Sequence, residues 1–432
     1  MNTSTKKGKG LGEYMPLAFA AGIGSMLGSG IIVGLSATIV VWQEGLGLDT
    51  TQVGLLSGIL TFAIAFGSLF GGRLADKIGR VLFFNWINLF YAIGAAICVF
   101  APNFTVLLIG LIIAGLASGA DLPVSMTIVS HDASDEATAA QLVSTTQVFW
   151  QVGVFISFIC AFLVSAMQGA TGGRVVFAIL TVFAVIAWLW RLLSPTFRRF
   201  HEAADVRDAA RPAIVGNGKV SVTKVLFGAD KKVLLTYFLA IVIFYVGWNL
   251  LANTWGQFQT YMFSKAGAAQ SLATGLGIIL NFVTLVLNIV FASIAGGKYR
   301  NKAFFAGIVI SLIAMAAMAM GGANLWVIVG ATAFMNLGSP LAGEALYKVW
   351  TQESFPIEIR ASIQGFINGF SRLCCGLFAL ITPALVLPET IQTTMWCFFG
   401  IVIIEGIAGT IMIRAQKKYG TDEERQAHKI AA

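Results

Sequence analysis

Ionisable side chains stand inside several long apolar runs of this chain, where a charge is costly. Asp121 lies two residues before Pro123, and Glu344 stands four residues before Lys348, so these last two share one helical face and can pair. A charge at the centre of a membrane costs roughly 2.5–3.5 kcal/mol, which makes such groups functional candidates. Asp121 and Glu344 are predicted to couple proton movement to another process, with static structural ion pairs as the alternative. Glu405, in the last apolar run, is expected to be peripheral.

Neutral amides and aromatic residues form a second set of candidates. An amide without a partner costs free energy in lipid, so amides gathered on particular helices indicate a water-filled cavity or hydrogen bonds between helices. Sugars and polyols need amides for their hydroxyls and an aromatic ring for their apolar face. The predicted solute-binding residues are Gln147, Trp150, Gln151, Asn249, Asn253, Trp255, Gln257, Asn281, Asn288, Lys348, Asn368 and Arg372. Lys348 and Arg372 could instead neutralise the carboxylate of an organic anion.

These residues must be positioned by segments that cross a membrane. Of the 432 residues, 57% are hydrophobic and only 11% are charged, against roughly 25% charged residues in soluble domains. A span needs about 20 apolar residues. Twelve segments qualify, at residues 16–42, 52–71, 82–101, 105–131, 139–167, 175–193, 233–262, 270–295, 303–320, 325–350, 362–386 and 391–413. The predicted fold is an all-α membrane protein with twelve transmembrane helices.

A long basic segment divides these spans into two groups of six. The predicted domains are an N-terminal half at residues 1–193, a cytoplasmic linker at 194–232 and a C-terminal half at 233–432. With both termini in the cytoplasm, 24 of the 28 Lys and Arg residues fall on the cytoplasmic side, as the positive-inside rule requires. The net charge of +8 is therefore explained by topology in a plasma (inner) membrane, without a nucleic-acid partner.

An internal repeat relates the two halves. Gly71-Gly72 and Gly296-Gly297, each followed by a basic residue, stand 225 positions apart after the second and eighth spans. Two further pairs have nearly the same offset: Asp121 with Glu344, and Gln147 with Arg372. Duplicated six-span halves are typical of secondary carriers, whose solute site lies near the membrane midplane between the halves.

The loop after the second span carries a specific motif. Its sequence, Gly72-Arg73-Leu-Ala-Asp76-Lys77-Ile-Gly79-Arg80, resembles the loop motif of the major facilitator superfamily. Charges at an aqueous boundary can break and remake ion pairs in each transport cycle, which suits an inner gate; ordinary topogenic charge is the alternative. The predicted gating residues are Gly72, Arg73, Asp76, Lys77, Gly79, Arg80, Glu353 and Arg360.

Further motifs resemble the sugar porter branch of that superfamily. Glu353-Ser-Phe-Pro-Ile-Glu-Ile-Arg360 is similar to the signature after the tenth span, and Gly247-Trp-Asn249 is similar to the Gly-x-Asn of the seventh. Gln147 with Gly153 resembles the glutamine site of the fifth span. The stretch Gly119–Pro123 resembles bacterial inositol-type members. The resemblance implies transport of a sugar or cyclitol.

The sequence also departs from this branch. Ile243 and Phe244 replace the paired glutamines that usually precede Gly-x-Asn, and Lys348 stands near the usual place of a tryptophan. The first span has no acidic residue, and Leu107 stands near the position of the usual arginine in the fourth. The carboxylate–arginine pair of proton-coupled sugar porters is therefore absent from its usual positions.

No phosphate-binding loop, HExxH helix or dinucleotide fingerprint occurs, so no enzyme activity, catalytic residue, metal or cofactor is predicted. The five cysteines lack zinc-like spacing and are expected to be inert. The sequence predicts a monomeric secondary active transporter that imports a neutral sugar or cyclitol, such as inositol, with protons by alternating access. The alternatives are an organic-anion symporter, a drug or metabolite exporter, and a nutrient sensor on the same scaffold.

Overall fold

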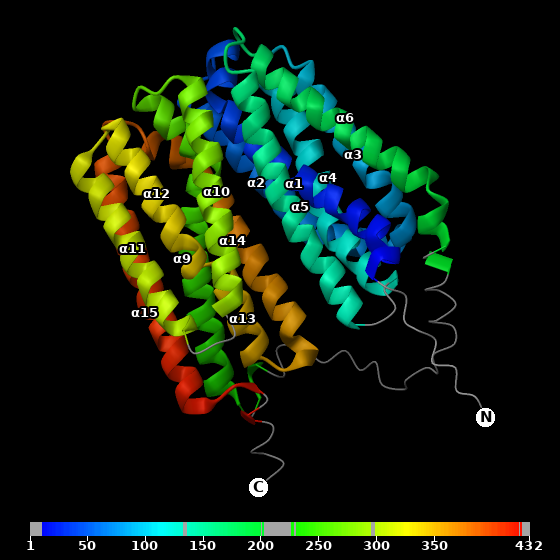
Figure 1. Ribbon diagram of the computed structural model, residues 1–432, viewed down its shortest axis with the longest axis vertical. Helices are drawn as coiled ribbons and strands as arrows, with labels where there is room; N and C mark the ends of the chain where they lie inside the picture. Colours follow the sequence, from blue (N-terminus) through cyan, green and yellow to red (C-terminus); the bar gives the residue numbers. More distant parts are fainter. Residues whose placement is uncertain are drawn as a thin grey trace. The chain divides into compact units, whose positions relative to one another are not determined.

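The computed structural model describes residues 11–132, 136–199, 201–202, 226–228, 230–294, 299–422 and 424–425. These residues form α-helices and no strand (Figure 1). The helices are α1 (Leu11–Leu46), α2 (Thr50–Ile78), α3 (Arg80–Val99), α4 (Phe104–Asp132), α5 (Glu136–Leu163), α6 (Thr171–Leu193), α9 (Lys231–Lys265), α10 (Gln270–Ile294), α11 (Arg300–Gly321), α12 (Leu325–Leu341), α13 (Glu344–Ser354), α14 (Ile357–Leu385) and α15 (Ile391–Tyr419).

Eleven segments among the described residues are long and apolar enough to cross a membrane, with α12 and α13 counted as one. The predicted fifth span corresponds to α5, whose apolar stretch at Val148–Leu163 is shorter. The predicted all-α membrane fold is confirmed, and the predicted spans coincide with observed helices. Most helices run beyond the predicted apolar limits, because their backbone hydrogen bonds continue into polar residues at the membrane surface.

The tenth predicted span, at residues 325–350, consists of two helices: α12 ends at Leu341 and α13 begins at Glu344. Pro340 lacks the backbone N–H that a helix interior needs, which favours a break. Gly343 stands in the break, and a Cβ there would lie 2.6 Å from Nε1 of Trp248. A small residue at the break therefore lets the Trp248 ring approach the backbone.

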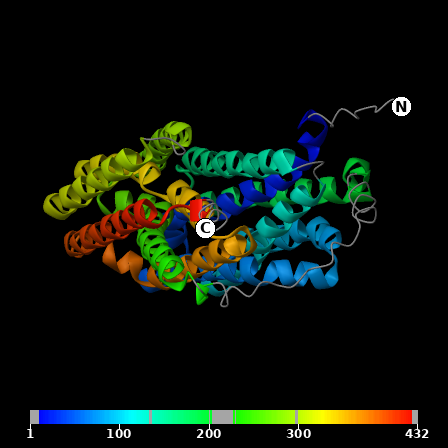
Figure 2. The same ribbon diagram turned by 90° about the horizontal axis from the view of Figure 1, so that it is seen from below.

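The chain forms two compact units. Unit 1 comprises Met1–Leu48 and Ile59–Gly216, and unit 2 comprises Asp49–Gly58 and Asn217–Ala432. In unit 1, α1 packs against α4, α5 and α6, and α3 packs against α4 and α6 (Figure 1). In unit 2, α9 packs against α14 and α15, and α11 packs against α12 and α15 (Figure 2).

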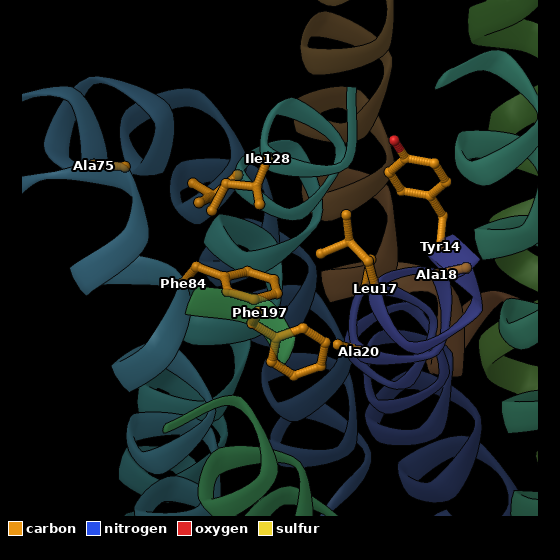
Figure 3. Close-up of a cluster of buried hydrophobic side chains, with 10 residues drawn as sticks. Tyr14, Leu17, Ala18, Ala20, Ala75, Phe84, Ile128 and Phe197 are labelled. Carbon is orange, nitrogen blue, oxygen red and sulfur yellow. The ribbon is translucent and has the colours of Figure 1, made fainter. Parts of the chain in front are cut away.

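A cluster of buried apolar side chains lies within unit 1 (Figure 3). Its members come from α1, α2, α3, α4 and the segment after α6: Tyr14, Leu17, Ala18, Ala20, Ala21, Ala75, Phe84, Val124, Ile128 and Phe197. Five chain segments thus share one packed core, which fixes the helix ends around it.

Small residues allow α3 and α4 to approach at backbone distance. A Cβ on Gly94 would lie 2.4 Å from the backbone nitrogen of Ala114 and 2.8 Å from the carbonyl oxygen of Gly110. Replacing Gly94 with alanine is expected to destabilise the protein by about 1–3 kcal/mol, because the backbone of α4 cannot yield as a side chain can. Thermal unfolding in detergent, followed by tryptophan fluorescence, measures the effect.

Gly400→Ala is the matched control, since a Cβ at Gly400 meets nothing within 4 Å. Equal unfolding midpoints for the two variants would show that the α3–α4 contact is looser than described.

Candidate functional site

A group of polar side chains lies where α9, α13 and α14 of unit 2 meet. Nδ2 of Asn249 donates to Oγ of Ser371 over 2.9 Å, and Nε of Arg372 donates to Oδ1 of Asn368 over 3.0 Å. Nζ of Lys348 lies 2.8 Å from Oε1 of Glu344. We call Asn249, Glu344, Lys348, Asn368, Ser371 and Arg372 the polar cluster.

The Glu344–Lys348 ion pair confirms the pairing predicted from their spacing. Each of the two side chains is 38% exposed, so the pair can meet water or a solute. The carboxylate of Glu344 also interacts with the charge of Arg372. The polar cluster therefore holds two cations and one carboxylate.

Two stacked tyrosines lie beside the polar cluster. The rings of Tyr245 and Tyr347 are 3.8 Å apart between centroids, and the Trp248 ring follows 5.7 Å from Tyr245. The hydroxyl of Tyr347 donates to the carbonyl oxygen of Gln364 over 3.2 Å. Neither tyrosine was predicted from the sequence, although the spacing of Tyr245 and Asn249 by four residues was a signal that they share a face of α9.

The Gly247-Trp248-Asn249 motif contacts three different helices. A Cβ on Gly247 would lie 2.8 Å from Cγ of Glu405 on α15. Nε1 of Trp248 donates to Oγ of Ser339 on α12 over 2.9 Å, while Asn249 bonds to α14. The motif therefore ties α9 to α12, α14 and α15 within three residues.

In unit 1, Asp121 forms a buried ion pair with Arg191. Nη1 and Nη2 of Arg191 lie 2.6 and 3.1 Å from Oδ1 and Oδ2 of Asp121. Both side chains are almost fully buried, at 0% and 3% exposure. Oγ of Ser125 donates to Oδ1 of Asp121 over 3.0 Å. The structural ion pair that the sequence left open for Asp121 is thus present, with a partner 70 residues away.

Arg191 makes further contacts that hold it in place. Nη2 donates to the carbonyl oxygen of Ala20 over 2.7 Å, and Nη1 donates to that of Phe84 over 3.1 Å. The guanidinium lies 3.9 Å above the Phe84 ring. One arginine on α6 therefore binds α1, α3 and α4 together beside the apolar cluster of Figure 3.

Comparison with known proteins matches residues 17–374 to the family described as the Major Facilitator Superfamily. The chain belongs to this superfamily. It is therefore a multi-pass membrane transporter for small-molecule solutes and not an enzyme.

The transporter is similar in sequence to bacterial proteins that are themselves named as transporters. It is 29% identical over 407 residues to the minor myo-inositol transporter IolF of Bacillus subtilis (strain 168), covering 91% of this chain and 89% of the relative. It is 31% identical over 154 residues to the niacin transporter NiaP of Acinetobacter baylyi (strain ATCC 33305 / BD413 / ADP1), covering 35% and 34% of the two chains.

Solved structures share the fold. The crystal structure of a D-xylose-proton symporter has a TM-score of 0.74 at 14% identity, covering 92% of this chain and 97% of the other. The inward-open xylose transporter XylE from E. coli has a TM-score of 0.73 at 15% identity, covering 96% and 99%. At these identities the likeness concerns the fold alone.

The other predicted solute-binding residues of the transporter have contacts or exposures that the structure describes within their own units. Nε1 of Trp255 donates to Oγ1 of Thr332 over 3.2 Å, and Nε2 of Gln257 donates to Oδ1 of Asn253 over 2.7 Å. Nδ2 of Asn281 donates to the Gly277 carbonyl within its own helix. Asn288 is exposed, and Trp150 and Gln151 of α5 are half-buried. The Gln147 side chain lies outside the described residues.

The predicted gating residues are described only in part. The side chains of Arg73, Asp76 and Arg360 lie outside the described residues, whereas Lys77, Gly79 and Arg80 are exposed and Gly72 is half-buried. Gly79 joins α2 to α3 with φ 109°, a conformation that favours glycine. Gly71, rather than Gly72, makes the close approach, since its Cβ would lie 2.5 Å from that of Ala120.

Glu353 has its partners within unit 2. Oε1 of Glu353 lies 2.6 Å from Nη1 of Arg300 at the start of α11, and its Oε2 accepts from Nε2 of Gln416 over 3.2 Å. Nη2 of Arg425 donates to the carbonyl oxygen of the neighbouring Ser354 over 2.7 Å. These contacts join one end of α11, α13 and α15, and a gating role for Glu353 stays a prediction.

The expectation that Glu405 is peripheral was wrong, because its side chain is buried in unit 2 with 3% exposure. The last span is apolar on all sides, so its hydropathy pattern does not indicate which side faces lipid. Among the described residues no group of three or more His, Cys, Asp or Glu side chains could hold a metal ion.

Proposed function

We propose that this transporter imports a neutral sugar or cyclitol, with inositol as the first candidate, together with protons. The observation that carries the proposal is the polar cluster beside the Tyr245–Tyr347 stack. Amide and hydroxyl groups can donate to and accept from solute hydroxyls, and aromatic rings can cover the apolar face of a sugar ring. The relative named as a myo-inositol transporter supports the choice of solute. The structural likeness to a D-xylose-proton symporter supports testing for proton coupling.

We also propose the membrane in which the transporter resides and the side on which its termini lie. The distribution of Lys and Arg supports a plasma (inner) membrane protein with both termini in the cytoplasm. The halves at residues 1–193 and 233–432, joined by the linker at 194–232, would move against each other in alternating access. A monomer suffices for this mechanism, and the charged residues after α2 and after α13 would open and close the inner side.

An organic anion is the second candidate, and Arg372 favours it. Its Nε donates to the neutral Asn368, and the polar cluster has one more cation than carboxylates. A solute carboxylate would balance that charge.

Uptake by a bacterial host that lacks its own transporters separates the two candidates. Labelled myo-inositol is expected to enter cells that express the chain, and unlabelled hexoses and polyols are expected to compete. Competition by carboxylates but not by polyols would overturn the neutral-solute proposal and transfer the solute role to Arg372 and Lys348.

Asn249 provides a residue-level prediction for the same assay. Replacing Asn249 with alanine is expected to raise KM about 2- to 10-fold, because one hydrogen bond to the solute is lost and Ser371 loses its donor. Gln392→Ala removes an exposed amide at the start of α15 and is the matched control. An unchanged KM for Asn249→Ala would remove this residue from the site.

A further inference from the structure

Glu405 is a buried acid at the middle of α15. It belongs to the buried stripe of this helix, which repeats at helical spacing: Phe398, Val402, Glu405, Gly409 and Met412. Glu405 lies fourteen positions from either end of α15, about 21 Å at the helical rise. The acid therefore lies near the middle depth of its span.

The contacts of α15 with α9 and α11 enclose this acid. On α9, a Cβ at Gly247 would lie 3.1 Å from Oε1 of Glu405. On the α11 side, a Cβ at Gly406 would lie 3.2 Å from Ile308. Oε1 is buried and has no hydrogen-bond partner among the described residues. Glu405 thus lies against Gly247 of α9, and the residue after it meets an aliphatic side chain of α11.

Charged groups on these three helices lie near the helix ends. On α9 they are Lys231, Lys232 and Lys265; on α11, Arg300 and Lys302; on α15, Arg414, Lys417 and Lys418. Arg414 is nine residues from Glu405, about 13 Å along the helix, and its side chain is exposed. The other titratable groups on α9 and α15 are Tyr237, Tyr245, Tyr261, Cys397 and Tyr419. Tyr245 is nearest along α9, and its ring stacks on Tyr347 of α13.

The other two acids inside the predicted spans differ from Glu405 because each has a basic partner. Asp121 binds Arg191 and Glu344 binds Lys348, so both carboxylates are compensated. Among the described residues the buried Oε1 of Glu405 has no hydrogen-bond partner. An ionised carboxylate without a partner in an apolar site is strongly unfavourable, so the acid is neutral there.

We propose, on the basis of the proposed proton-coupled uptake, that Glu405 is the site that binds the transported proton. In the described conformation the carboxyl group carries the proton. When the contact between α9 and α15 at Gly247 opens to water, the O–H bond breaks, the proton passes to water and the carboxylate is solvated. Asn249 of the polar cluster stands two residues further along α9, so a movement of α9 affects both the solute contact and the acid.

Infrared spectroscopy of the purified transporter tests the protonation directly. The wild-type protein at neutral pH is expected to show the C=O stretching band of a protonated carboxylic acid, and Glu405→Gln is expected to lack it. Glu389→Gln, which removes an exposed acid just before α15, is expected to retain the band. Absence of this C=O band from the wild type, or persistence of the band in Glu405→Gln, would overturn the proposal. If Glu405→Gln does not fold, Glu405→Asp must shift the band, and an unmoved band counts against the proposal.

Transport by the same variants tests the coupling. In Glu405→Gln, solute accumulation driven by a pH gradient is expected to fall at least tenfold below wild type. The rate of solute exchange at equal pH is expected to stay within about threefold of wild type. Wild-type accumulation in Glu405→Gln would overturn the role of Glu405 and leave the proposed function intact. If the wild type moves none of the solutes, the proposed function fails, and the infrared band still decides whether Glu405 holds a proton.

Discussion

Replacing Asp121 with alanine is expected to destabilise the transporter by about 3–5 kcal/mol, because it leaves the Arg191 guanidinium buried without its counter-charge. Arg191 has 0% side-chain exposure, so water cannot replace the carboxylate. The carbonyl oxygens of Ala20 and Phe84 would remain as partners, but they carry no net charge. The unfolding midpoint in detergent, followed by tryptophan fluorescence, and the yield of monodisperse protein measure this loss.

A double-variant cycle separates the ion pair from general damage. Arg191→Met is expected to be similarly destabilising, and the double variant Asp121→Ala with Arg191→Met is expected to be more stable than the sum of the single effects predicts. Arg174→Gln is the control on the same helix, where Nη2 of Arg174 donates to the carbonyl oxygen of Ala101 over 2.9 Å. Single variants within 1 kcal/mol of wild type, or strictly additive effects, would contradict a stabilising pair.

The contacts of Asp121 bear on whether its role is static or proton-carrying. A carboxylate held by two guanidinium nitrogens and Ser125 is well compensated, which supports the static role. Its proton-coupling role stays a prediction, as does that of Glu344. Uptake by the Asp121→Asn variant tests this role. If the variant still accumulates solute against the solute gradient in a pH-dependent manner, Asp121 does not couple protons to transport.

Replacing Gly24 with valine is expected to destabilise the protein by about 3 kcal/mol or more. A Cβ at Gly24 would overlap Oδ2 of Asp121 and lie 2.8 Å from Nη2 of Arg191. Neither side chain can move away without breaking its other bonds, so overpacking adds to the distortion of a buried ion pair. The unfolding midpoint again measures the effect.

Gly330→Val is the matched control, since Gly330 of α12 is exposed and a Cβ there meets nothing within 4 Å. Its midpoint is expected to stay near that of the wild type. If Gly24→Val unfolds at the same temperature as Gly330→Val, the space around the Asp121–Arg191 pair must be larger than the structure describes.

The spans were predictable because lipid demands long apolar helices. The break between α12 and α13 was missed, since Pro340 is tolerated in many membrane helices and a hydropathy pattern has no feature for a break of two residues. Pairing within one helix, as in Glu344–Lys348, follows from spacing and was predicted.

Pairing between helices could not be predicted in this way. Arg191 stands in the last turn of α6, where a basic residue normally serves topology, and nothing in the sequence relates it to Asp121. The buried position of Glu405 was hidden for a different reason. Its neighbours Ile403, Ile404 and Ile407 are exposed while Val402 is buried, so both faces of α15 are apolar and periodicity cannot assign the core side.

Accumulation in proteoliposomes that contain only this transporter tests the central claim most directly. With an imposed pH gradient, acidic outside, labelled myo-inositol or a competing neutral sugar is predicted to accumulate above its external concentration and to leave when an uncoupler is added. Entry that merely equilibrates regardless of the gradient would contradict proton coupling. Gradient-driven accumulation of a carboxylate, with no movement of any neutral polyol or sugar, would contradict the proposed solute.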